Sequence, residues 1–206
     1  MIAKAAVPGR VKTRLSPPCS PEQAAALARA ALADTLAAAG ATAGVDRRVL
    51  VLDGAPGPPV PPGWEIIPQR GGGLADRLAG AFADTGGPAL LVGMDTPQVT
   101  PALLEHGLAA LAMADAVLGR APDGGFWAIG LQTPDPAVFA GVPMSVETTG
   151  AVQARRLDEL GLRAVALPEL RDVDDIEDAR AVAALAPDSA FARALAAVEP
   201  GLEAAA

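Results

Sequence analysis

The chain alternates short apolar runs with longer segments of helical pattern over most of its length. Apolar runs of strand length fall at residues 1–7, 48–53, 64–69, 88–94, 116–119, 126–131 and 163–167. This alternation predicts an α/β fold, here a three-layer α/β/α sandwich with a mostly parallel sheet. The run at 88–94 is apolar throughout, which is typical of a strand covered on both faces.

One pair of these runs predicts that the sheet is mixed. The loop between residues 116–119 and 126–131 is shorter than the dozen or so residues that a parallel crossover needs. If the two strands are neighbours, they are therefore antiparallel.

Helix starts are marked by capping residues. Ser20, Pro21 and Gln23 have the pattern of an N-cap, a first-turn proline and a capping-box glutamine, which predicts a helix that ends near Gly40. Thr100 followed by proline predicts a second helix start.

The length of 206 residues predicts one domain, over residues 1–199, and we expect residues 200–206 to be a disordered tail. The alanine-rich stretch 24–39 is interrupted by Arg29 and Asp34, which argues against a membrane span. No charged segment followed by a long apolar one opens the chain, and Cys19 is the single cysteine. We therefore expect a cytoplasmic protein with no membrane partner.

The net charge of −8 limits the classes of partner. An acidic protein has no overall basic field to collect the phosphates of a nucleic-acid polymer, although a small anion in one pocket remains compatible. The single histidine, His106, excludes a His-rich zinc site.

Four cations gather near the start of this acidic chain: Lys4, Arg10, Lys12 and Arg14. The last three alternate with other residues, so on an extended backbone they project to one side. Gly9, after Pro8, allows the backbone to come close to a ligand. Arginine and lysine in this arrangement predict a site for phosphate. The alternative is a solvated basic loop that pairs with surface carboxylates.

Three aspartates are candidate metal ligands. Asp95 follows the apolar run 88–94, and Asp172 and Asp174 alternate on the approach to a helix. If these carboxylates meet, their repulsion is relieved by a divalent cation, and oxygen ligands favour Mg²⁺ or Mn²⁺. The alternative for Asp95 is that it caps a turn before Pro97.

Two glycine-rich segments offer close backbone approach to a ligand. Residues 71–73 are glycines that precede a helix, where free N–H groups suit an anion or a base edge. Asp123, Gly124 and Gly125 combine a carboxylate with backbone freedom. The alternatives are a flexible turn for the first segment and a hairpin turn for the second.

These residues carry a family resemblance. The motifs are, in order, Lys4 with residues 8–15, Gln69 with Gly72 and Arg77, residues 93–97, residues 123–126 and residues 172–174. In this order they resemble the DUF2064 family, GT-A-fold proteins often named glycosyltransferases in arsenosugar biosynthesis. A more distant similarity links them to molybdenum-cofactor and phospholactate guanylyltransferases. The resemblance covers the chain from Lys4 to about Leu185 and does not identify the substrate.

The resemblance implies a nucleotide-diphosphosugar transferase-like fold and a role for each matching position. Residues that would hold phosphates are Lys4, Arg10, Lys12 and Arg14. Residues that would approach the base or ribose are Gly72, Gly73 and Arg77. The metal would be bound by Asp95, Asp172 and Asp174. The acceptor would face Asp123, Ser145 and Glu147.

Three functions stay open from the sequence. The first is a Mg²⁺-dependent glycosyltransferase that uses a nucleotide sugar and a small-molecule acceptor, with Asp123 or Glu147 as general base. The second is a nucleotidyltransferase that releases pyrophosphate from a nucleoside triphosphate. The third is a non-catalytic nucleotide-binding protein. In either enzyme, we expect Lys12 and Asp95 to belong to the catalytic set with the two candidate bases.

Overall fold

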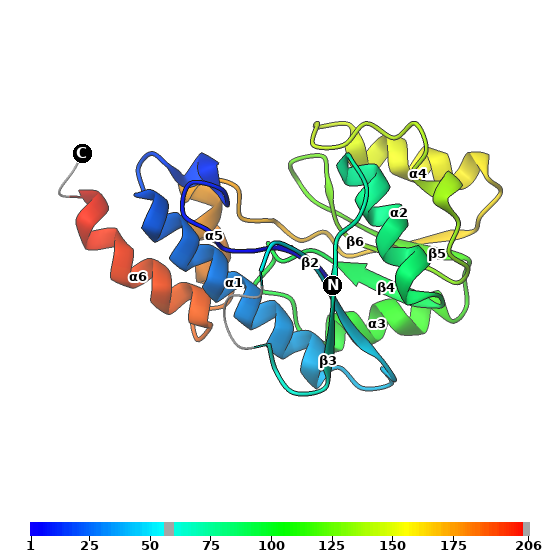
Figure 1. Cartoon of the computed structure of the whole chain (residues 1–206), viewed down its shortest axis with the longest axis horizontal. Coiled ribbons are helices and arrows are strands. Elements are labelled where there is room, and N and C mark those ends of the chain that lie inside the picture. The colour runs from blue at the N-terminus through cyan, green and yellow to red at the C-terminus, as the bar shows by residue number, and fades with distance from the viewer. Residues whose placement is uncertain (56–59, 204–206) are drawn as a thin grey trace.

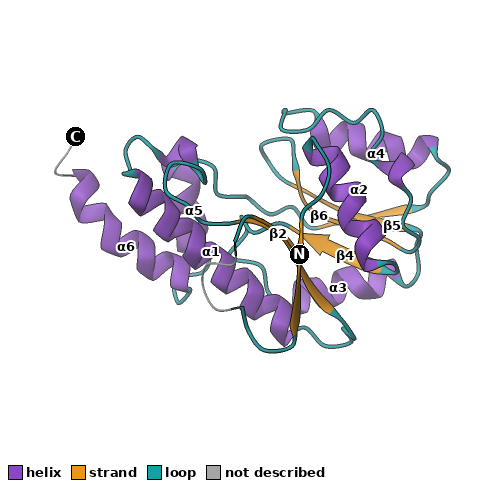
Figure 2. Ribbon diagram, viewed as in Figure 1, coloured by secondary structure: helices purple, strands orange, loops and turns teal. Residues whose placement is uncertain are grey.

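The structure is a computed structural model that describes residues 1–55 and 60–203. Its strands form two sheets (Figure 2). One sheet holds, in spatial order, the parallel strands β1 (Ile2–Lys4), β2 (Arg48–Asp53) and β3 (Trp64–Pro68). The other holds, in spatial order, β4 (Ala89–Val92), β6 (Phe126–Leu131), β5 (Ala116–Arg120) and β7 (Ala164–Leu167). Strand β6 is antiparallel to β4 and β5, whereas β5 and β7 are parallel, so the predicted mixed arrangement is confirmed.

Helices connect most of these strands (Figure 1). The α-helices are α1 (Pro21–Ala41), α2 (Leu74–Thr85), α3 (Pro101–Leu111), α4 (Thr149–Glu159), α5 (Ile176–Leu185) and α6 (Ala190–Glu203). Two short 3₁₀ helices are η1 (Thr13–Leu15) and η2 (Pro136–Val138).

The start of α1 has the predicted capping box. The Ser20 hydroxyl accepts a hydrogen bond from the Gln23 backbone N–H at 3.2 Å, and Gln23 Oε1 accepts one from the Ser20 N–H at 2.7 Å. Two of the N–H groups that a helix start leaves unpaired are thereby satisfied. Such a cap contributes about 1 kcal/mol, and here it begins the helix that follows the basic loop, residues 8–15.

Both faces of the strands are covered by helices. In β2, Leu50 packs with α1 and α3 in one apolar cluster, whereas its neighbour Val51 packs with α2 and α4 in another. Alternate strand residues point to opposite faces, so these two clusters lie on the two sides of the sheets. The first cluster also includes Ala3 of β1 and Val92 of β4, so the two sheets share one core. The three-layer α/β/α sandwich predicted from the sequence is confirmed.

A third apolar cluster lies among α1, α5 and α6, which gather at one end of the molecule in Figure 1. Phe191 and Leu195 of α6 pack there against Leu27 of α1. The same cluster contains Leu15, at the end of the basic loop, and Val173, between two of the candidate metal ligands. The two charged segments are therefore anchored in one helical assembly.

The last helix extends into residues 200–206, where a disordered tail was expected. Helix α6 continues through Pro200 to Glu203, and only residues 204–206 lie outside the described part of the chain. The burial of Phe191, Leu195 and Val198 against the other helices stabilises α6 up to the proline.

Helix α1 is long and apolar enough, by length and composition, to cross a membrane. Arg29 and Asp34 alone therefore do not exclude a span by this criterion. Half of the most apolar window of α1 is buried within the protein. Its apolar residues include Leu32 and Leu36 of the first cluster and Leu27 of the third, which is the packing of a core helix.

Candidate functional site

A cleft of about 530 Å³ opens at the carboxyl ends of β1, β3 and β4. In open α/β sheets this is the edge at which ligands bind. The predicted site residues that line the cleft are Lys4, Arg14, Arg77, Asp95, Asp123, Gly125, Ser145, Glu147, Asp172 and Asp174. A second cavity of about 520 Å³ lies near the opposite ends of the strands, beside Arg48 and Trp64, and no predicted site residue lines it.

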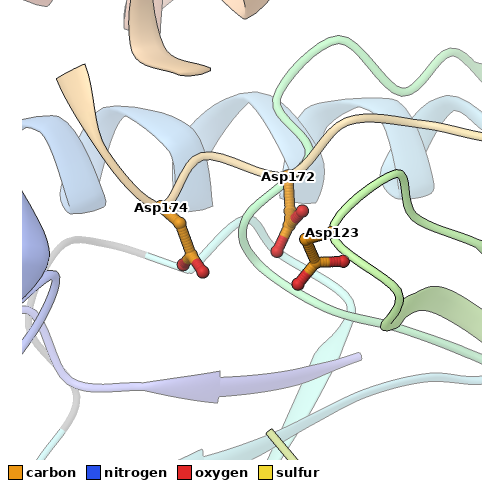
Figure 3. Close-up of side chains that lie close together, drawn as sticks. All are labelled: Asp123, Asp172 and Asp174. Carbon is orange, nitrogen blue, oxygen red and sulfur yellow. The ribbon is translucent and has the colours of Figure 1, made fainter. Parts of the chain in front are cut away.

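The acidic strap, residues 171–174, runs along one side of the cleft. Val173 is buried at 1 % exposure, and its backbone N–H donates a hydrogen bond to the Asp95 carbonyl at 2.9 Å. Because the strap is extended, Asp172 and Asp174 flank Val173 and turn their carboxylates to the other side. Figure 3 shows both carboxylates directed toward the same space.

Asp123 completes a group of three carboxylates with Asp172 and Asp174. One oxygen from each of the three lies within 4.8 Å of the others (Figure 3). Among residues 1–55 and 60–203, this is the one group of this kind, and Asp95 is not part of it. The third carboxylate in the group is therefore Asp123, which we had expected to face the acceptor.

The turn between β5 and β6 holds Asp123 in place. Asp123 Oδ1 accepts a hydrogen bond from the Gly125 N–H at 2.8 Å. Gly124 has a φ of +90°, and a Cβ at this position would lie 1.8 Å from the Glu147 carbonyl oxygen. Its own carbonyl accepts a hydrogen bond from the Gly150 N–H at 2.7 Å. This turn therefore packs directly against residues 147–150, and only glycine fits at the contact.

The electrostatics of the three carboxylates favour a cation. Burial, together with repulsion from Asp123 and Asp174, raises the pKa of Asp172 to about 6. A divalent cation removes this repulsion, and hard carboxylate oxygens are the ligands that Mg²⁺ and Mn²⁺ prefer. The residues present therefore fit such an ion.

Lys12 lies behind the wall of the cleft. Its ammonium is 3.0 Å from Asp95 Oδ2 and 3.5 Å from Asp174 Oδ1, and it donates a hydrogen bond to the Val173 carbonyl. Its side chain is only 8 % exposed. Burial by itself would lower the pKa of Lys12, but the attraction of Asp95 and Asp174 outweighs it, and the pKa is raised. The basic loop and the acidic residues far from it in the sequence do converge, with Lys12 and Asp95 in direct contact.

Lys4 and the other residues of the basic loop differ in their access to the cleft. Lys4 is exposed and lines it. Arg14 lines it as well and places its guanidinium 2.5 Å from Asp174 Oδ2. Gly9 and Arg10 are exposed but do not line the cleft, and within the described ranges Arg10 forms no ion pair.

Arg77 of α2 forms the far side of the cleft. It donates a hydrogen bond to Gln69 Oε1 at 3.3 Å, and its Nε is buried with no partner in the described residues. Gln69 also lines the cleft and donates to the Ala3 carbonyl at 2.7 Å. Gly72 and Gly73 do not line it, because Gly73 is the N-cap of α2 and its N–H donates to Asp76.

The loop 143–148 covers the remaining side. Ser145 and Glu147 are exposed and line the cleft, and Ser145 has a φ of +61°. The loop is held by Thr149, whose hydroxyl donates to the Pro143 carbonyl and accepts from the Val146 N–H. Ser145 and Glu147 thus lie on a hydrogen-bonded loop that lines the same cleft as Lys4.

Several lining residues were not expected from the sequence. Gln69 and Phe126 were noted only within motifs, and Leu74 was not singled out for the site. The signal for Gln69 was its position directly after the strand 64–68, at the edge where Lys4 and Asp95 also lie. The apolar residues gave no signal distinct from that of core residues.

Comparison with solved structures shows the same fold in transferases. A provisionally named nucleotide-diphospho-sugar transferase from Desulfovibrio desulfuricans G20 aligns with a TM-score of 0.85 and 24 % identity, over 98 % of this chain and 96 % of that one. CMP:2-keto-3-deoxy-manno-octonic acid synthetase in complex with CTP aligns with a TM-score of 0.55 and 14 % identity, over 90 % and 97 %. The 2-C-methyl-D-erythritol 4-phosphate cytidylyltransferase of Thermus thermophilus aligns with 0.52 and 18 %, over 90 % and 98 %.

The sequence comparisons identify the family. No curated protein sequence matches the chain. The family described as "Uncharacterized protein conserved in bacteria (DUF2064)" matches residues 23–146, which is more than half of the chain and includes the turn at Asp123 and the loop at Ser145. The chain therefore belongs to the DUF2064 family.

Proposed function

We propose that this protein is a divalent-metal-dependent transferase that acts on a nucleotide-activated donor, with a nucleotide-diphosphosugar as the donor and a glycosyl group as the group transferred. The observation that carries this proposal is the composition of one cleft. Lys4, Arg14 and Arg77 line it together with the group of three carboxylates. A diphosphate with a bound metal ion matches such a surface, because cations and a carboxylate-held ion both neutralise its charge.

The metal, Mg²⁺ or Mn²⁺, would be held by Asp123, Asp172 and Asp174. When bound, it would supply neutralisation of the charge that develops on the departing phosphates. Lys12 lies behind this group and pairs with Asp95, which lines the cleft, and the Asp95 carbonyl holds the strap in place.

The remaining residues would bind and orient the two substrates. Lys4 and Arg14 lie on the side of the cleft that would take the donor phosphates, and Arg77 on the side that would take the ribose or base. Glu147 is exposed within the same cleft, so its carboxylate would accept the proton of an acceptor hydroxyl as that oxygen attacks the sugar. Ser145 would bind the acceptor beside it.

A second candidate is nucleotidyl transfer. Its support is the similarity of the fold to the CTP-bound synthetase and to the cytidylyltransferase, each over 90 % of this chain. In this reaction an acceptor oxyanion attacks the α-phosphorus of a nucleoside triphosphate, and pyrophosphate leaves. Positioning and charge neutralisation would dominate, and no general base is needed.

The test is a thermal-shift panel of nucleotides and nucleotide sugars, each with and without Mg²⁺. We expect at least one nucleotide to raise the melting temperature only when the metal is present. The shift should vanish in Asp172→Asn and persist in Asp158→Asn, which changes an exposed aspartate on α4. A shift that needs no metal, or that Asp172→Asn retains, would contradict the proposal.

Product analysis separates the candidates. Release of a nucleoside diphosphate in the presence of acceptors indicates glycosyl transfer, and release of pyrophosphate indicates nucleotidyl transfer. Metal-dependent binding without turnover across a broad acceptor panel would leave a nucleotide-binding protein.

A further inference from the structure

Lys12 occupies an oxygen-lined position that resembles a cation site. Its ammonium contacts Asp95 Oδ2, Asp174 Oδ1 and the Val173 carbonyl. These are carboxylate and carbonyl oxygens, the ligand types of hard metal ions. With 8 % of its side chain exposed and no place in the lining of the cleft, Lys12 is badly situated to touch a phosphate there.

Two further observations show that the position is built for a cation. The backbone of Lys12 is left-handed, with φ 47° and ψ 45°, a conformation that is uncommon for a lysine and costs free energy. In addition, Asp95 Oδ1 is buried and has no partner among the described residues, so one ammonium does not use all the oxygens gathered around it. The positive charge of Lys12 is thus held at this point despite an unfavourable backbone conformation at Lys12 and an unpaired acceptor, Asp95 Oδ1.

We propose that Lys12 is a positioning residue whose ammonium fills a second cation position, between Asp95 and Asp174, so that the site takes a single divalent ion. The inference rests on the proposed metal-dependent function, in which that single ion lies among Asp123, Asp172 and Asp174. Asp174 belongs to both positions, and Lys12 holds it from behind while the metal would bind it from the cleft.

The proposal gives Asp95 a different role from that of a metal ligand. Asp95 serves as the counterion of Lys12, and its backbone carbonyl holds Val173. Removal of the ammonium would leave Asp95, Asp174 and the Val173 carbonyl facing an open space. These oxygens form an incomplete coordination shell that water can complete around a second ion.

The test counts Mn²⁺ ions per chain by native mass spectrometry and by the titration of free Mn²⁺, with the metal alone and no nucleotide. We expect one tightly bound ion in the unaltered protein and one additional ion in Lys12→Ala. The matched control is Arg14→Ala, which removes an exposed cation from the same carboxylate, Asp174, and leaves Lys12 in place. This control should bind the same number of ions as the unaltered protein.

A second measurement covers the case in which Lys12→Ala folds badly. Its melting temperature without metal should be lowered, and Mn²⁺ should restore more of it than Mn²⁺ adds to the unaltered protein. The double variant Lys12→Ala with Asp95→Asn removes a ligand of the new position and should lose the additional ion. An unchanged ion count in Lys12→Ala together with weaker nucleotide binding would overturn the proposal. It would support a role for Lys12 in binding the donor phosphates. Failure of Mn²⁺ to restore a misfolded Lys12→Ala would count against it as well.

The outcomes also separate this inference from the proposed function. If the unaltered protein binds no Mn²⁺ but Lys12→Ala binds one ion, the second cation position stands and the metal-dependent function falls. If the unaltered protein binds one ion and the variant gains none, the function stands and the role of Lys12 falls.

Discussion

Asp172 is the residue on which the electrostatics of the cleft act most strongly. Its carboxylate is partly buried and lies beside Asp123 and Asp174. The backbone of the acidic strap is fixed beside it by the hydrogen bond from the Val173 N–H to the Asp95 carbonyl. The repulsion among these carboxylates is therefore present in the metal-free protein, and a bound cation would relieve it.

This repulsion predicts a pH dependence of stability. The pKa of Asp172 is about 6 in the folded chain, against 3.8 for an ordinary aspartate, so the folded state holds the proton more tightly. As the pH rises from about 4 to 6, loss of the proton therefore costs stability. Without metal, Asp172→Asn should be more stable than the unaltered protein at pH 7, by about 1 kcal/mol after allowance for solvent screening, and the advantage should disappear near pH 4.

The measurement is chemical denaturation of both proteins in chelator across this pH range. Mn²⁺ should reverse the order at pH 7, because only the unaltered protein retains all three carboxylates. A constant difference between the two proteins from pH 4 to 7 would show that Asp172 titrates normally.

At the level of single residues, the sequence predicted that cations and carboxylates would meet at one edge of the sheet. It did not predict which cation would pair with which carboxylate. The basic loop, Asp95 and Asp172 were placed at one edge because each follows a predicted strand. The contact between Lys12 and Asp95 joins two loops whose relative position depends on packing in the third apolar cluster, and no local pattern encodes it. The place of Asp123 in the carboxylate group likewise depends on the turn that Gly124 permits.

The elements show where local signals are strong and where packing overrides them. The strands 48–53 and 126–131 have the predicted bounds, because apolar residues and turn signals delimit both sharply. Helix α1 begins at the predicted cap. Helix α6 was not predicted, and it contains Pro200, a helix-ending signal; burial of its first turns against α1 and α5 stabilises it.

The contact between the β5–β6 turn and the loop before α4 allows a matched pair of glycine substitutions. Gly124→Ala combines a positive φ with a Cβ placed 1.8 Å from the Glu147 carbonyl oxygen, so we expect it to cost more than about 3 kcal/mol of unfolding free energy. Gly141→Ala also has a positive φ but has nothing within 4 Å of its Cβ, and it should cost only about 1 kcal/mol. Urea denaturation of both variants measures the difference, and equal costs would show that the contact is not tight.

Across the whole molecule, the site is assembled from segments at both ends of the chain and from its middle. The basic loop and the acidic strap share the cluster of α1, α5 and α6, whereas the β5–β6 turn joins two strands of the four-stranded sheet and the loop 143–148 packs against that turn. A ligand in the cleft would therefore bridge two parts of the fold.

This arrangement predicts a concerted change in hydrogen exchange. Mg²⁺ with the stabilising nucleotide should slow amide exchange in residues 8–15, 121–125 and 171–175 together, because the ligand contacts all three segments. Helix α3, which does not line the cleft, should change little. Mass-spectrometric exchange with and without the metal measures this, and protection confined to one segment would contradict a shared site.

The separate anchoring of the loop 143–148 has an evolutionary consequence. Thr149 and the turn at Gly124 hold this loop, and neither depends on Leu15 or Val173, which support the charged groups. Under the proposed function, a substitution of Ser145 or Glu147 would alter the molecule that receives the transferred group and leave the residues that handle the donor in place.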